Sequence, residues 1–255
     1  LLVQYVDFAS WQRRELGPRL VAHRAYWRDQ LREGALPPLE LPLDFPRPAV
    51  QTFSGDTVPV ALPTEVAARL EGVGRAHGCT LFQLVLAMWS LLLCRHAGQE
   101  EVVVGTPYHG RDASGSEGLI GYLVNMLPLR VDVARGSTVG GLLRCAREAA
   151  AGGIAHAALP FQQMVEEELP RRAFDASRNA VFQTMLAWED DAELELARPA
   201  MGGTGESGLL GGSVRLEAGA VLLVESAVPH GYVEPSLHQW PRGHGSHRVR
   251  VPLGW

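Results

Sequence analysis

Two apolar stretches separated by a short polar loop constrain the fold of this chain more than any other feature. The first, residues 102–107, reads Val-Val-Val-Gly-Thr-Pro, and the second, residues 118–130, is apolar around one amide, Asn125. β-Branched residues favour strands, and continuous apolar runs of this length are typical of strands that are buried on both faces. The sequence therefore predicts two buried strands that are joined by a polar loop around Gly110.

Helical patterns alternate with further apolar strands along the rest of the chain. The pattern predicts helices over residues 7–34 (in two pieces broken near Gly17-Pro18), 64–77, 80–94, 138–151 and 160–168, and further strands over 57–62 and 180–188. Gly78 is expected to end one helix and Thr80 to cap the next. A proline-rich segment, residues 35–53, is expected to be a surface connector. Helices interleaved with a few strands predict an α/β layered domain.

Composition excludes several classes of function. The net charge of −5 gives no support for nucleic-acid binding, and no basic run indicates a membrane surface. The longest apolar run, residues 81–94, is shorter than the roughly 20 residues that a membrane-spanning helix needs. Three widely spaced cysteines without a CxxC pair are typical of free thiols in a reducing compartment, and no zinc-ligand spacing occurs. We therefore expect a cytoplasmic globular protein without a metal site. Because the chain lacks an initiator methionine, we expect Leu1 to mark a cut within a longer chain.

A series of short segments resembles the motifs of condensation domains from nonribosomal peptide synthetases. The segments and the patterns that they resemble are 5–12 (YxDFAxWQ), 25–31 (AYWxxxL), 41–48 (LPxDxPRP), 102–111 (VVGTPxxGR), 118–130 (IGxxVNxxxxR), 156–163 (HQDxPFE) and 175–183 (DxSRNPxFQ). Each segment is weak evidence alone, but they occur in the expected order over residues 5–190. The resemblance covers most of the chain.

The resemblance implies a fold and a function. The fold is the C-terminal half of a chloramphenicol-acetyltransferase-like two-layer sandwich, a mixed sheet with flanking helices, over residues 1–195. The complete domain is a transferase that forms peptide bonds between thioesters carried on the phosphopantetheine arms of carrier proteins. No cofactor is expected to bind directly. The implied partners are an upstream N-terminal lobe, donor and acceptor peptidyl carrier proteins and an adjacent adenylation domain.

The histidine motif of that family is missing from this chain. The family uses HHxxxDG, whereas the nine histidines here include no adjacent pair and no Asp-Gly dipeptide occurs. A general base must lie within hydrogen-bond reach of the attacking amine, so we assign no catalytic residue and expect this chain to be inactive alone. His109 and His156 lie in family-like segments and are interpreted as surface or helix-end histidines.

The resemblance also implies which residues line the substrate tunnel. The floor loop, around residues 108–118, and its neighbours supply the candidates Tyr108, Gly110, Arg111, Asp112, Asn125, Ser177 and Arg178. Each has a structural alternative: Asn125 as a core amide bound by backbone groups, Arg111 and Asp112 as a local ion pair or solvated charges, and Ser177 and Arg178 as turn residues. The sequence leaves these alternatives open.

The C-terminal part departs from the family pattern. Residues 213–219 fit a strand that enters a turn, and 234–237 resemble a family helix start, but 228–233 match nothing. We expect residues 196–255 to be a divergent or frame-disrupted tail that packs badly. The GxGxxG match at 203–208 follows no strand and is attributed to chance. Two rival functions stay open: a carrier-docking scaffold without chemistry, and part of an epimerisation or cyclisation domain.

Overall fold

A computed structural model of the chain describes residues 3–31, 38–43, 46–50, 60–112, 116, 118–168, 177–179, 181–190, 213–216 and 220–226. Its elements are α1 (Tyr5–Leu31), β1 (Val60–Leu62), α2 (Thr64–Ala76), α3 (Leu81–Ala97), β2 (Glu101–Tyr108), β3 (Asn125–Asp132), α4 (Val139–Ala155), α5 (Phe161–Glu168), β4 (Thr184–Asp190), β5 (Ser213–Leu216) and β6 (Ala220–Ser226).

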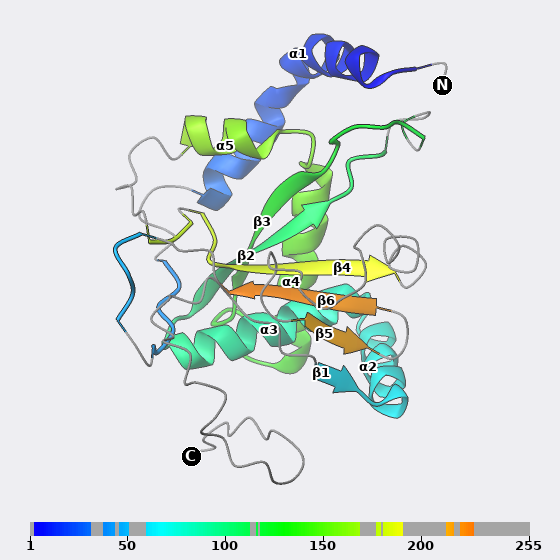
Figure 1. Ribbon diagram of the computed structural model, residues 1–255. Helices are drawn as coiled ribbons and strands as arrows, with labels where there is room; N and C mark the ends of the chain where they lie inside the picture. Colours follow the sequence, from blue (N-terminus) through cyan, green and yellow to red (C-terminus); the bar gives the residue numbers. More distant parts are fainter. Residues whose placement is uncertain are drawn as a thin grey trace, which may run out of the picture.

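The strands form one mixed sheet (Figure 1). Its order is β1-β5-β6-β4-β2-β3, in which β1 pairs with β5 and β2 with β4 in parallel, while the other neighbours are antiparallel. The two strands expected from the apolar stretches, β2 and β3, are an antiparallel pair in which Val104 lies opposite Leu129. The predicted α/β fold with a mixed sheet and flanking helices is confirmed.

Helices α3 and α4 lie side by side and cover the β2–β3 part of the sheet (Figure 1). The core between these layers contains fully buried aliphatic side chains, among them Leu86 of α3, Val104 of β2, Val131 of β3 and Leu143 of α4. At about 25 cal/mol per Å² of buried apolar surface, such a layer is the main source of stability in an α/β domain. Helix α1 packs on the short helix α5 outside this layer.

Local signals in the sequence set the ends of the central helices. Helix α2 ends before Gly78, which adopts a left-handed conformation at φ 63°, and Thr80 forms a capping box with Gln83 at the start of α3. The left-handed conformation places a Cβ too close to the backbone in most residues, so glycine is the usual choice there. The predicted helix stop and cap are both confirmed.

The first helix differs from the expectation of two separate pieces. Helix α1 is continuous from Tyr5 to Leu31, although its axis changes direction part-way along (Figure 1). Pro18 removes one backbone donor from the helix interior, which bends a helix when packing holds both halves. The break predicted near Gly17-Pro18 is therefore wrong.

Beyond β4, the structure describes two further strands, β5 and β6. Strand β5 falls within the strand predicted at 213–219, and β5 and β6 lie between β1 and β4 in the sheet. The GxGxxG match and residues 227–255 lie outside the described residues, and the boundary at 195/196 stays a prediction. Over the described residues, no single helix has the length and apolarity to cross a membrane; only α2 and α3 together, bent by 98°, meet that test by length and composition.

Candidate functional site

A cavity of about 530 Å³ lies where four family-like segments meet. Its walls come from the N-terminal part of α1, the end of β2 with its loop, residues 122–125 before and at the start of β3, and the residues that connect α4 to α5. Of the expected tunnel residues, Tyr108, Gly110, Asp112 and Asn125 line this cavity. Segments that are far apart in the sequence thus form one concave site.

The loop after β2 is held by its own polar side chains. The Tyr108 hydroxyl donates to Asp112 Oδ1 at 2.6 Å, and burial together with this carboxylate raises the pKa of Tyr108 to about 12. The Arg111 guanidinium donates to the carbonyls of Ser116 and Leu119 at 2.8 and 2.9 Å. Within the described loop, Arg111 and Asp112 therefore each bind a separate partner, so neither of the two alternatives, a mutual ion pair or two solvated charges, describes them.

Gly110 is required where this loop passes Leu123, in the irregular segment that precedes β3. Its φ of +65° is left-handed, and a Cβ at this position would overlap the Leu123 carbonyl oxygen. Both the conformation and the close approach exclude a side chain. Gly110 therefore allows the loop to lie against the cavity wall.

Asn125 joins the start of β3 to the connection between α4 and α5. Its amide nitrogen donates to the carbonyls of Ala157 and Leu159, both at 2.8 Å. Its amide oxygen accepts from the backbone N–H groups of Met126 at 3.0 Å and Phe161 at 2.9 Å. These four bonds use both N–H donors and both acceptor lone pairs of the Asn125 side-chain amide. Asn125 is therefore a backbone-bound core amide that also borders the cavity.

An aromatic row on α1 forms a wall of the cavity that the sequence analysis did not assign to the site. Tyr5, Phe8 and Trp11 are spaced three residues apart, with ring centroids 6.5 and 5.7 Å from one another. The Tyr5 hydroxyl donates to the Tyr122 carbonyl at 3.0 Å, which ties this helix to the loop before β3. The spacing of three residues was the available signal, because it places side chains on one helix face.

His156 lies behind the cavity, at the C-terminal end of α4. Its ring stacks on Tyr26 at 4.2 Å, and its Nδ1 lies 3.1 Å from His23 Nδ1. Burial, and then the neighbouring His23 ring, lower the pKa of His156. The Trp27 indole donates to the His156 carbonyl at 2.9 Å. These contacts agree with the interpretation of His156 as a helix-end histidine.

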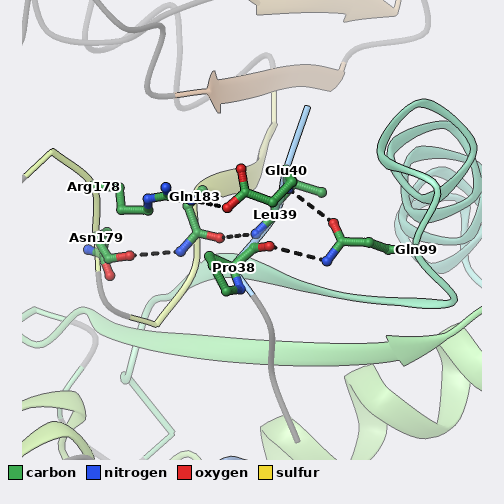
Figure 2. A network of polar contacts seen from close by, with 7 residues as sticks. All are labelled: Pro38, Leu39, Glu40, Gln99, Arg178, Asn179 and Gln183. Atoms are coloured by element: carbon green, nitrogen blue, oxygen red, sulfur yellow. Dashed lines mark hydrogen bonds and ion pairs between the residues drawn. The ribbon is translucent and has the colours of Figure 1, made fainter. Parts of the chain in front are cut away.

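Ser177 and Arg178 lie away from the cavity lining, beside the proline-rich connector. Arg178 pairs with Glu40 at 2.7 Å, and Ser177 is buried. Figure 2 shows Arg178 and its neighbour Asn179 next to the extended residues 38–40. Their positions agree with the alternative in which they are structural residues of a turn.

Two glutamine side chains hold the connector at the same place (Figure 2). Gln183 Oε1 accepts from the Leu39 N–H at 2.7 Å, while its Nε2 donates to the Asn179 carbonyl at 2.7 Å. Gln99 donates to the Pro38 carbonyl and accepts from the Glu40 N–H, both at 3.1 Å. Leu39 is only 5% exposed and anchors the connector here, whereas most of the other described connector residues are exposed, as expected of a surface connector.

The described lining of the large cavity supplies a concave surface and hydrogen-bonding groups but no imidazole. Among its described lining residues, the titratable groups are the phenols of Tyr5, Tyr108 and Tyr122 and the carboxylate of Asp112. The raised pKa of Tyr108 keeps its phenol protonated at neutral pH, where it cannot act as a base. No group of three or more potential metal ligands occurs among the described residues. The described lining therefore supplies hydrogen-bonding groups and apolar surface without an imidazole.

Comparison with known proteins gives one consistent family. The family model described as "Condensation domain" matches residues 2–204. Malpinin synthetase from Mortierella alpina is 39% identical over 202 residues, which cover 79% of this chain and 3% of that protein. Phosphinothricin tripeptide synthetase PhsC from Streptomyces viridochromogenes is 38% identical over 191 residues, which cover 74% of this chain and 17% of that protein. The chain thus spans only a small part of the length of these relatives.

Solved structures show the same fold. The condensation domain from the monacolin K polyketide synthase MokA superposes with a TM-score of 0.67 at 18% identity. The match covers 89% of this chain and 57% of that chain. At this identity, the likeness extends to the fold.

Proposed function

The chain belongs to the condensation-domain family, and we propose that it is the C-terminal lobe of a domain that joins two carrier-bound thioesters through a peptide bond. The observation that carries this proposal is the convergence of residues 5–12, 108–112, 122–125 and 154–162 on one cavity. These ranges include or adjoin the segments that resemble the family motifs. The family match over residues 2–204 supports the same assignment.

The proposed reaction is an aminolysis. The amine of an acceptor aminoacyl thioester attacks the carbonyl carbon of a donor acyl thioester. The new C–N bond forms, the C–S bond of the donor breaks, and the amine proton is transferred so that the donor carrier's phosphopantetheine leaves as a thiol. Holding both thioesters in reach of one another supplies much of the rate, because it turns an encounter in solution into a reaction within one complex.

In this proposal the base comes from the upstream N-terminal lobe, and the present lobe binds and orients. The absence of HHxxxDG from the sequence and of an imidazole from the described cavity lining both support that division. The proposed partners are therefore the N-terminal lobe, donor and acceptor carrier proteins and an adenylation domain, in the cytoplasm. Beyond the carrier arms, the proposed reaction uses no cofactor.

A condensation assay tests the proposal. Donor- and acceptor-loaded carrier proteins are mixed with the 255-residue chain or with the chain extended upstream through an HHxxxDG lobe, and dipeptidyl thioester is measured by mass spectrometry. We expect product only from the extended chain, and the same extended chain with the second motif histidine changed to alanine is the control. Product from the 255 residues alone would overturn the assignment of the base. Carrier binding without product in the extended chain would favour the docking scaffold instead.

A further inference from the structure

A second, smaller cavity opens between the sheet and the helices that cover it. It has a volume of about 170 Å³ and lies between the ends of β2 and β3, strand β4 and helices α3 and α4. Thr106, Leu127 and Leu129 face it from the sheet, and Ala150 faces it from α4. The proposed reaction does not yet use this space.

The walls of the small cavity are largely apolar, and several of them are fully buried. Leu127, Leu129 and Ala150 are at most 2% exposed, so their positions are held by the core around them. Phe82 and Trp188 meet edge to face at its border, with ring centroids 6.3 Å apart at 84°. A concave apolar site of this kind favours an aliphatic or aromatic group over water or a charge.

The small cavity adjoins the large one. Tyr108 and Ile154 line both cavities, Tyr108 from the end of β2 and Ile154 from the last turn of α4. The bond from the Tyr108 hydroxyl to Asp112 holds the phenol at this boundary. A ligand in the large cavity could therefore extend an apolar group past Tyr108 and Ile154 into the small one.

We propose that the small cavity is a specificity subsite that accepts an apolar side chain or acyl group of the substrate bound in the large cavity. That a tethered thioester occupies the large cavity rests on the proposed function. That an apolar group enters the small cavity rests on the lining of that cavity. An enclosed apolar cavity of about 150 Å³ binds benzene, so this open pocket of about 170 Å³ suits a group of that size. Charged side chains would lose their hydration there without a partner. The domain would thus select substrates with an apolar group of about four to six carbons.

A binding experiment on the full chain separates this subsite from the proposed function. The probes are pantetheine, hexanoyl-pantetheine and N-methylhexanamide, titrated while the methyl NMR signals of Leu127 and Leu129 are followed. Each buried methylene adds about fourfold in affinity. We expect hexanoyl-pantetheine to bind at least about tenfold more tightly than pantetheine, and both hexanoyl probes to shift the two leucine signals.

Substitutions that fill or enlarge the cavity provide the controls. Ala150→Leu should remove the gain from the hexanoyl group, whereas Ala151→Leu, at the next and exposed position of the same helix, should keep it. If Ala150→Leu does not fold, Phe82→Ala at the border should instead shift the preference from hexanoyl to octanoyl-pantetheine.

The outcomes of the three probes are distinct. Equal binding of pantetheine and hexanoyl-pantetheine, without shifts at the leucines, would overturn the subsite and leave the proposed function standing. Binding of N-methylhexanamide at the leucines without any binding of pantetheine would support the subsite and count against the carrier-arm proposal. Absence of binding by both hexanoyl probes would overturn the subsite.

Discussion

Two residues in the cavity wall make hydrogen bonds within the protein that leave their side chains unavailable for chemistry on a substrate. The amide oxygen and nitrogen of Asn125 both bond to backbone groups, and the Tyr108 hydroxyl donates a hydrogen bond to Asp112. Neither side chain is available as a base. Their contribution to the proposed reaction is to keep the wall in one shape.

Replacing Asn125 tests this role. In Asn125→Ala, the carbonyls of Ala157 and Leu159 and the N–H of Phe161 lose their side-chain partner. Because an unpaired buried polar group costs about 1–3 kcal/mol, we expect a loss of roughly 2–4 kcal/mol in the free energy of unfolding, measured with urea. The control is Gln162→Ala, an exposed residue that lines the same cavity. Equal stabilities of the two variants would show that the four bonds of Asn125 contribute little.

At the scale of elements, the ends of helices and strands position the site. The loop after β2 turns back at Gly110, and the connection after α4 is tied to β3 by Asn125. Helix α1 adds its aromatic row from outside the sheet layers. The cavity is therefore assembled at the ends of elements whose middles form the core.

Comparing Gly98 with Gly110 distinguishes the cost of a left-handed backbone from the cost of a steric overlap. Gly98 and Gly110 both have φ of +65°, but a Cβ at Gly98 meets nothing within 4 Å while one at Gly110 meets the Leu123 carbonyl. We expect Gly98→Ala to cost about 1–2 kcal/mol, the usual penalty of a left-handed alanine, and Gly110→Ala to cost more. Thermal or urea unfolding measures both. In addition, only Gly110→Ala should shift the NMR signals of Tyr108 and Leu123; equal costs without such shifts would contradict the close approach.

At the scale of the whole molecule, contacts between α1 and the residues after α4 hold the first helix to the layered domain. Trp27 is fully buried and bonds the His156 carbonyl, and the Tyr26 and His156 rings stack. The Nδ1 atoms of His23 and His156 lie 3.1 Å apart, which requires that at least one ring is neutral. Acid should therefore weaken this attachment.

The pH dependence follows from the lowered pKa of His156. Since the folded chain holds this proton less tightly than the unfolded chain, the stabilisation is present above the ordinary histidine pKa of about 6.5 and is lost as pH falls through the lowered value. We expect the free energy of unfolding to fall on acidification below about pH 6.5, and to fall less in His156→Gln. His96→Gln, at an exposed position, is the matched control. Parallel pH profiles for the wild type and His156→Gln would refute the role of this ring.

Local patterns predicted much of the fold. The β-branched runs marked β2 and β3, and Gly78 and Thr80 marked the boundary between α2 and α3 because these signals act within one turn of chain. The break expected in α1 was wrong, because the helix continues through Pro18 with a change of direction instead of ending there. The anchoring of the connector at Leu39 and Glu40 was also missed, because their partners, Gln183 and Gln99, are 144 and 59 residues away.

By itself, the sequence determined the class of fold, the family motifs and the absence of a histidine pair. These are properties of residue type and short spacing, which the chain carries before it folds. Only the tertiary structure decided that Tyr108, Asn125 and the aromatic row of α1 share a cavity, while Ser177 and Arg178 lie at the connector. The physical reason is that packing between distant segments determines which side chains meet, and short-range sequence patterns do not predict such long-range contacts.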